Sequence, residues 1–309
     1  MAPLVLIVSP RDDSHAEVVA HVLEREFNSR TLFWDSTAFP LEELLTYFAD
    51  ERGSGATLTT VDGTFDLRHV DAIWWRRPFP PELPQMDPAL RDFCEREAMM
   101  LFRGALLSSG VRVVNNPDRQ SRANQKPLQL SEAWKVGLRI PRTLMTNDPR
   151  AARTFVKEFS TRCIHKPFNQ VDFGVLHTRR CEDSDLADLE SLLLAPIILQ
   201  EEVPGLDLRV NVFGDRVFAA AATVRAEAKL DWREDHTVEW YPYDLDGETS
   251  ARCIALVRKL GLDYGCIDLK APEGELPCFL EINPAGQFLF IEIHTGQALV
   301  DSLCRILVN

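Results

Sequence analysis

Two acidic residues and an asparagine near the C-terminus are spaced to bind a metal ion. Glu281 and Asn283 stand two positions apart in an apolar run, so on a β-strand both side chains point to one face. Asp268 lies in the preceding apolar run, which is expected to pair antiparallel with the second run. Hard oxygen donors on adjacent strands suit Mg²⁺, which also takes phosphate oxygens. The alternative is a structural ion pair, because acidic pairs on strands are common.

A second group occupies residues 200–209, where an apolar strand runs into acidic residues, turns at Pro-Gly and returns through Asp-Leu-Arg. Backbone groups at such a hinge can pair with the edge of adenine. Asp207 can accept hydrogen bonds from ribose hydroxyls, and Arg209 can neutralise a phosphate. The alternative is the solvated rim of a hairpin. The candidate residues of this hinge are Gln200, Glu201, Glu202, Val203, Asp207 and Arg209.

Several basic residues could contact phosphate. Lys166 lies in a strand that is otherwise predicted to be buried, and Lys126 lies near the start of a helix. Arg225 ends a strand and Arg233 lies in the irregular stretch that follows, so both could hold a phosphate or a substrate carboxylate. Taken singly, each is more often an ordinary surface residue.

A tryptophan and arginine cluster spans residues 74–77, Trp-Trp-Arg-Arg. The tryptophans are expected to pack, because exposing such large apolar side chains is costly. Arg76 and Arg77 are expected to emerge at the carboxyl end of the strand, where open α/β sheets usually place ligands.

The elements that position these residues predict an α/β fold with α+β units. Residues 3–9, 15–27 and 31–35 alternate strand, helix and strand, which favours a parallel sheet. A hairpin is predicted around Asp62–Gly63, and a long helix over residues 88–108. Asn115-Asn116-Pro117 breaks the chain and marks the first boundary. The expected domains are residues 1–117, a small central unit over 118–196, and a C-terminal antiparallel sheet over 197–309.

Composition narrows the class of protein. The net charge of −13 argues against nonspecific binding of nucleic acid, which needs a basic surface. Seven cysteines without a CxxC pair predict a reducing compartment and no disulfide framework. The N-terminus lacks the features of a signal peptide, and there is no run of about 18 apolar residues, so no membrane span is expected. A cytoplasmic location is therefore expected.

The order of these groups, more than any one of them, resembles the ATP-grasp superfamily. The resemblance covers nearly the whole chain, with residues 198–212 (ILQEEVPGLDLRVNV) similar to its nucleotide hinge and 279–284 (FLEINP) to its metal strand. Within the superfamily the chain most resembles the peptide-macrocyclising ligases of microviridin and other graspetide pathways. The stretches that carry this resemblance are 73–78 (IWWRRP), 229–233 (KLDWR), 241–245 (YPYDL) and 281–292 (EINPAGQFLFIE).

The resemblance implies a pre-ATP-grasp domain, ATP and Mg²⁺ as cofactors, and a role for each candidate. Lys126 and Lys166 would contact phosphates, and Asp207 would hold ribose. Asp268, Glu281 and Asn283 would hold Mg²⁺. The partner would be a ribosomally made precursor peptide, and a homodimer is also expected. The implied roles for the remaining side chains are adenine contact for Glu201 and Val203, and phosphate and acyl phosphate binding for Arg209, Arg225 and Arg233.

The expected reaction activates a carboxylate with ATP and joins it to a hydroxyl or an amine through an acyl phosphate. One departure is the missing glycine-rich phosphate lid after Lys166, for which residues 172–174 are the expected substitute. Two other functions stay open. One is a ligase acting on a free amino acid, a small molecule or a protein tail. The other is a nucleotide-binding regulator without turnover.

Overall fold

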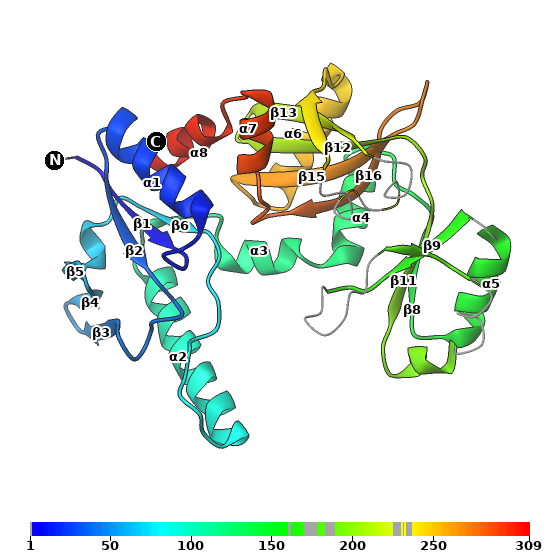
Figure 1. Cartoon of the computed structure of the whole chain (residues 1–309). Coiled ribbons are helices and arrows are strands. Elements are labelled where there is room, and N and C mark those ends of the chain that lie inside the picture. Colours follow the sequence, from blue (N-terminus) through cyan, green and yellow to red (C-terminus); the bar gives the residue numbers. More distant parts are fainter. Residues whose placement is uncertain are drawn as a thin grey trace.

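The described part of the chain forms four β-sheets with helices between them, as the computed structural model in Figure 1 shows. The structure describes residues 2–159, 162–169, 178–182, 189–224, 230, 232 and 237–309. The mixed α/β character expected from the sequence is confirmed. None of the described helices is both long enough and apolar enough to cross a lipid bilayer.

The N-terminal sheet is parallel and has the strand order β2-β1-β6-β7. Its strands are β1 (Leu4–Val8), β2 (Arg30–Trp34), β6 (Ala72–Trp75) and β7 (Arg112–Val114). Helix α1 (Ser14–Glu26) begins at the N-cap Asp13, whose carboxylate accepts from the backbone N–H groups of His15 and Ala16. The long predicted helix is α2 (Pro88–Ser108), capped by Asp87.

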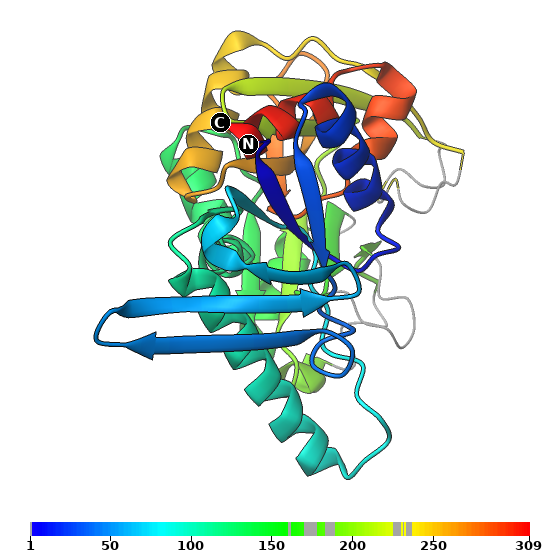
Figure 2. The same ribbon diagram turned by 90° about the vertical axis from the view of Figure 1, so that its left-hand side faces the viewer.

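A small antiparallel sheet extends from this N-terminal unit, and its long hairpin projects sideways in Figure 2. It contains β3 (Leu44–Asp50), β4 (Gly53–Thr60) and β5 (Gly63–Asp66), followed by a 3₁₀ turn at Leu67–His69. The hairpin predicted around Asp62–Gly63 is confirmed as β4–β5. Strand β3 was not expected. It pairs with β4 along its whole length, from Leu44 opposite Thr59 to Asp50 opposite Gly53.

The central sheet has the order β10-β9-β11-β8 and is covered by α5 (Pro149–Phe159). Its strands are β8 (Thr143–Thr146), β9 (Cys163–Lys166), β10 (Arg179–Arg180) and β11 (Ile197–Glu201), with a 3₁₀ segment at Leu189–Leu193. Strand β11 pairs with β8 and β9. The structure thus places β11 in the central sheet, whereas the expected boundary between residues 196 and 197 put this strand in the C-terminal unit.

The C-terminal sheet is antiparallel, with the order β14-β13-β12-β15-β16. Its strands are β12 (Leu206–Phe213), β13 (Arg216–Thr223), β14 (Glu239–Pro242), β15 (Tyr264–Ala271) and β16 (Cys278–Asn283). One face packs on α6 (Gly247–Lys259) and α4 (Lys126–Lys135) through Leu208, Ile267 and Ile282. Part of the other face packs on α1, α7 (Leu289–Thr295) and α8 (Leu299–Val308). Helix α3 (Pro117–Ala123) precedes α4 and passes beneath the C-terminal sheet in Figure 1.

Candidate nucleotide and metal site

A row of charged residues crosses three strands of the C-terminal sheet. Arg209 of β12 is directly opposite Asp268 of β15, and Asp268 is directly opposite Glu281 of β16. Residues directly opposite in antiparallel pairs point to the same face of the sheet. The alternate residues of these strands, such as Ile267 and Ile282, fill the apolar core on the other face. The sheet therefore presents a cation and two carboxylates side by side.

Arg209 and Asp268 form the buried end of this row. The Arg209 Nη1 atom donates to Asp268 Oδ1 at 2.7 Å, and Nη2 donates to the carbonyl oxygen of Gln287 at 2.9 Å. Burial opposes the charged form of Arg209, but the surrounding acidic groups, Asp268 foremost and Glu281 among them, together outweigh burial and raise the pKa of the guanidinium. A charge this deeply buried needs such a partner. Arg209 is thus fixed as a cation at the inner end of the row.

Glu281 forms the more open end, where α4 supplies its partner. Lys126, the first residue of α4, places Nζ 2.5 Å from Glu281 Oε2, and each side chain keeps about a quarter of its surface exposed. Asn283 is exposed, and its Oδ1 accepts from the backbone N–H of Ala285. Among the described residues, no group of three or more His, Cys, Asp or Glu could hold a metal. The expected metal set consists of two carboxylates and one amide.

A second pair lies beside the row, between β12 and β15. Asp207 is directly opposite Lys270, and Lys270 Nζ donates to Asp207 Oδ2 at 2.8 Å. Both residues are buried. Lys270 was not a candidate in the sequence, although its position two residues after Asp268 already predicted that both face the same side. The residue expected to hold ribose therefore has a lysine partner within the protein.

Two buried amides hold the strands that carry the carboxylates. Gln129 of α4 pairs with Ile282 in both directions, donating to its carbonyl oxygen at 2.8 Å and accepting from its N–H at 3.2 Å. Asn115 donates to the carbonyl oxygens of Tyr264 and Pro284, which lie at the start of β15 and just after β16. These amides replace backbone partners that the ends of the strands lack. Sequence reasoning missed both residues.

Arg76 does not emerge toward a ligand as expected. Its side chain is fully buried, and its Nη1 donates to the carbonyl oxygen of Ala285 at 2.6 Å. Its Nε lies 3.4 Å from Oδ2 of Asp13. The arginine thus joins the N-terminal sheet to the loop that follows β16, the strand that carries Glu281 and Asn283. Arg77 is exposed.

The hinge connects the central sheet to the C-terminal sheet. Gln200 donates from Nε2 to Thr143 Oγ1 at 2.9 Å, and Glu202 receives two 2.7 Å hydrogen bonds from Arg180. The hydrogen bonds from Arg180 lower the pKa of the Glu202 carboxyl. Gly205 has φ +120°, and a Cβ there would lie 2.2 Å from the carbonyl oxygen of Ala271. Only glycine lets the hinge pass so close to β15.

The remaining candidates have different outcomes. Lys166 is the last residue of β9 in the central sheet and lies opposite Ile198 of β11. The other lysine candidate, Lys126, pairs with Glu281 of the C-terminal sheet, so the two lysines are associated with different sheets. Glu201 ends β11, and the buried Val203 follows it. Arg225, Arg233 and the expected lid at 172–174 lie outside the described residues.

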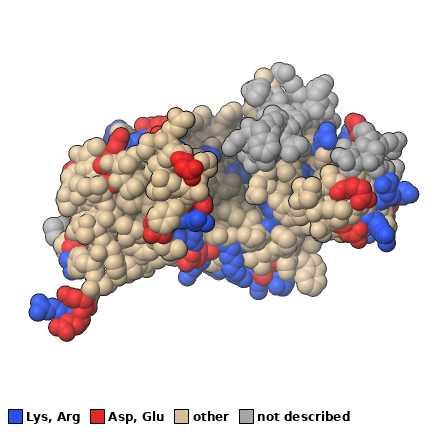
Figure 3. Space-filling view, turned by 90° about the horizontal axis from the view of Figure 1, so that it is seen from below, with Lys and Arg blue, Asp and Glu red and all other residues tan. Residues whose placement is uncertain are grey.

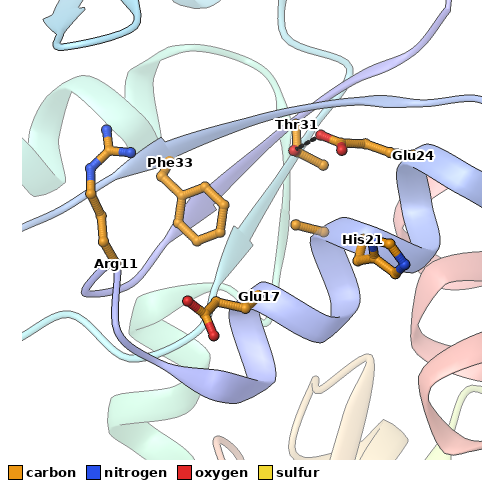
Figure 4. A pocket seen from close by; sticks show the side chains of 7 residues that line it. Arg11, Glu17, His21, Glu24, Thr31 and Phe33 are labelled. Atoms are coloured by element: carbon orange, nitrogen blue, oxygen red, sulfur yellow. Dashed lines mark hydrogen bonds between the residues drawn. The ribbon is translucent and has the colours of Figure 1, made fainter.

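The surface is hollowed between the two ends of the molecule. Figure 3 shows this hollow from below, with Lys and Arg side chains along its edges. A separate cavity of about 320 Å³ lies between α1 and β2, and its lining includes Arg11, His21 and Phe33 (Figure 4). It shares no residue with the charged row or the hinge. We therefore assign the candidate site to the row and the hinge, where the chemically useful groups meet.

Comparison with known proteins identifies the family of the chain. A family model described as the MvdD pre-ATP grasp domain matches residues 4–121. The macrocyclase MdnC of Microcystis aeruginosa MRC, solved with precursor peptide MdnA, is 32% identical over 99% of both chains, with a TM-score of 0.90. The macrocyclase MdnB of the same organism is 29% identical over 99% of both chains, with a TM-score of 0.85.

A third structure adds a nucleotide and a metal. The ATP-grasp ligase PsnB, solved with a minimal precursor, Mg and ADP, is 28% identical, with a TM-score of 0.80 over 100% of this chain and 98% of that chain. No curated protein matched the sequence. The fold and these comparisons together define an ADP-forming ATP-grasp ligase. More narrowly, the chain belongs to the graspetide-type ATP-grasp macrocyclases.

Proposed function

We propose that this enzyme uses ATP to join a side-chain carboxylate of a ribosomal precursor peptide to a hydroxyl or amine of the same peptide. The observation that carries the proposal is the row Arg209–Asp268–Glu281 with Lys126 at its open end. Alternating cations and carboxylates on one sheet face can hold both a polyphosphate and the metal ion that accompanies it.

Asp268, Glu281 and Asn283 fit Mg²⁺ as a set of oxygen donors, and the ion would supply charge neutralisation at the phosphates. Lys126 contributes a second positive charge next to Glu281, so it is well placed to contact a phosphate. Lys166 is proposed to contact phosphate from the central sheet. The proposed hinge contacts are adenine for Gln200, Glu201, Glu202 and Val203, and ribose for Asp207.

A carboxylate must be activated before acyl transfer, because it carries no good leaving group. A carboxylate oxygen of the peptide attacks the γ-phosphorus of ATP, the bond to the β-phosphate oxygen breaks, and ADP leaves. The hydroxyl or amine then attacks the acyl carbon, and phosphate leaves with the former carboxylate oxygen. Arg209 is fixed beside Asp268 and offers a permanent positive charge to the transferred phosphoryl group. Arg225 and Arg233 are proposed to bind the acyl phosphate.

The similarity to MdnC and PsnB supports a peptide as the partner. MdnC was solved with its precursor peptide, PsnB with a minimal precursor, and this chain aligns along nearly the full length of both. The overall negative charge of −13 argues against nucleic acid as a partner. A cytoplasmic location stays a prediction.

The test is to incubate the protein with ATP, Mg²⁺ and a candidate precursor peptide, and to follow ADP and peptide mass together. The expected result is one ADP for each water lost from the peptide. Glu281→Gln should abolish both signals, while Glu275→Gln, on an exposed turn, serves as the matched control. ADP release with free amino acids instead of peptide would favour the small-molecule ligase. Nucleotide binding without ADP release from any acceptor would favour the regulator.

A further inference from the structure

Two cysteines face each other across β9 and β10. The β9–β10 register pairs Arg179 with His165 and Arg180 with Ile164. One step further along the same register, the N–H of Cys181 donates to the carbonyl oxygen of Cys163 at 2.8 Å. Their sulfur atoms are 3.4 Å apart, and neither cysteine is in a disulfide bond.

This geometry suits a disulfide bond. Residues directly opposite in an antiparallel pair have Cα atoms about 4.5–5.5 Å apart, which lies within the range of roughly 4.4–6.8 Å found across disulfides. The sulfurs must approach by roughly 1.4 Å to reach a bond length of about 2.05 Å. Rotation of the two side chains can supply this approach, because the backbone hydrogen bond already holds the strands together.

The two thiols differ in access. Cys163 is fully buried, whereas Cys181 is partly exposed and directly follows β10, the edge strand of the central sheet. A disulfide oxidant in solution therefore reaches Cys181 before Cys163. Cys163 is then the only described cysteine whose sulfur is in contact with that of Cys181.

We propose that Cys163 and Cys181 form a reversible intrachain disulfide with a glutathione-type disulfide as the oxidant. The Cys181 thiolate attacks that disulfide, its S–S bond breaks, and one glutathione thiol leaves. The Cys163 thiolate then attacks Cys181 Sγ and displaces the second glutathione. The protein loses two electrons and two protons, and the oxidised glutathione is reduced to two thiols.

The bond would fasten the edge strand to β9 at the border of the candidate site. Lys166 lies three residues after Cys163 on β9, and Arg180, next to Cys181, holds Glu202 of the hinge. Cross-linking residues 163 and 181 also restricts the unfolded chain, so the oxidised protein should resist unfolding more than the reduced protein. The proposal does not depend on the peptide-ligase function.

The experiment treats the folded, full-length protein with oxidised glutathione, blocks the remaining thiols and identifies digested peptides by mass spectrometry. We expect a linked peptide containing both cysteines, the loss of two hydrogens, a higher melting temperature, and reversal by dithiothreitol. Cys94→Ser, which removes a partly exposed thiol on α2, should leave all of these signals unchanged.

Two variants separate the proposed steps. Cys163→Ser should trap a glutathione adduct on Cys181, because the thiol that displaces it is gone. Cys181→Ser changes a partly exposed residue, so it keeps the test valid if Cys163→Ser does not fold, and it should leave Cys163 unmodified. Wild-type protein that accumulates the glutathione adduct at Cys181, or that keeps both thiols free under these conditions, would overturn the proposal.

Discussion

Asp268 and Glu281 are opposite neighbours, yet their surroundings give them different tolerance to mutation. Asp268 neutralises Arg209, whose side chain is only 5% exposed, whereas Glu281 pairs with a lysine that water also reaches. Removing one member of a buried ion pair leaves an uncompensated charge, and removing one member of an exposed pair costs little. Mutations of the two carboxylates should therefore differ in their effect on stability but have a similar effect on activity.

We predict that Glu281→Gln lowers ADP formation by at least about a hundredfold. Mutating a residue that only hydrogen-bonds a metal ligand already lowers activity or metal affinity by roughly 10–100-fold, and Glu281 is proposed to be a ligand itself. The free energy of unfolding should change by less than about 1 kcal/mol. Asp268→Asn should lose activity to a similar degree and cost about 3 kcal/mol of stability as well. Urea unfolding and an ADP assay measure the two effects. If Asp268→Asn is as stable as Glu281→Gln, the buried pair does not matter for the fold.

His15 of α1 makes a pH-dependent contact with the start of α7, near the other end of the chain. Its Nε2 accepts from the backbone N–H groups of Phe288 and Leu289, both at 3.1 Å, which requires a neutral ring. Burial, aided by the nearby Arg76 charge, lowers the pKa of His15 from 6.5 to about 4. Between these values the unfolded state holds a proton that the folded state lacks.

We therefore predict that stability is lost as the pH falls from about 6.5 toward 4, by on the order of 3 kcal/mol from this residue. Glu43 acts in the opposite direction, because burial raises its pKa to about 7 and its contribution is lost as the pH rises from 4.5 toward 7. The measurement is urea unfolding across this range for wild type and His15→Gln. The free energy of unfolding of the variant should fall less steeply than that of the wild type as the pH is lowered. Equal slopes for the two proteins would rule out His15 as the cause.

At the scale of elements, sequence patterns located most helices and strands but not their partners. Helices α2 and α5 follow from periodicity, and the β4–β5 hairpin follows from its Asp-Gly turn. Helix α3 was missed because Asn116-Pro117 was interpreted as a chain break. In the structure Asn116 is the N-cap and Pro117 the first helical residue.

The positions of the candidate site residues on their strands and helices were predicted to a similar extent. Side chains two apart on one strand could be assigned to the same face, so Glu281 and Asn283 were grouped correctly on β16. The alignment of Arg209 with Asp268 and Glu281 depends on the register between three strands, which local patterns do not encode. The reach of Lys126 from α4 depends in turn on how that helix packs on β16.

The hinge offers an element-scale prediction through Gly205. An alanine there would need an unfavourable backbone at φ +120° and would press its Cβ against the backbone of Ala271 and Pro272. We predict that Gly205→Ala costs about 2 kcal/mol or more and weakens ATP binding, because the hinge must shift away from β15. Gly214→Ala is the matched control, since its φ is +57° and nothing lies within 4 Å of the added carbon.

Thermal unfolding and a titration with a nonhydrolysable ATP analogue measure both effects for the two glycines. The control should lose about 1 kcal/mol, the typical cost of a left-handed residue, and keep its nucleotide affinity. Equal nucleotide affinity in the two variants would argue against a hinge role for the backbone at Gly205.

At the scale of the whole molecule, the N-terminal and C-terminal sheets are joined by buried polar contacts. Trp74 Nε1 donates to the Tyr264 hydroxyl at 3.1 Å, and Arg76 reaches the loop after β16. Helices α1 and α8 also pack together, as Figure 1 shows. Strand β16, which carries the candidate ligands Glu281 and Asn283, is therefore braced by the first third of the chain.

The first half of helix α2 lies outside the hydrophobic core of the N-terminal unit. Helix α2 extends beyond the N-terminal sheet in Figures 1 and 2, and none of its first ten residues is buried. Apolar side chains nonetheless recur along it at helical spacing. The exposed fractions are 52% for Leu90, 55% for Phe93, 75% for Met100 and 40% for Leu101. An apolar stripe on a helix is usually covered by another element.

We predict that a second copy of the chain covers this stripe in a symmetric homodimer. Met100 is the most exposed of these apolar side chains, so a carboxylate introduced there would lose its hydration when a second copy covers the stripe. Met100→Glu should therefore shift the molar mass in light scattering from dimer toward monomer, by a change in dimer affinity of about tenfold or more. Leu194→Glu, at a 92% exposed position far along the chain, is the control and should keep the dimer. A wild-type protein that is monomeric at all accessible concentrations would contradict this assembly and leave the α2 stripe to the peptide or to another protein.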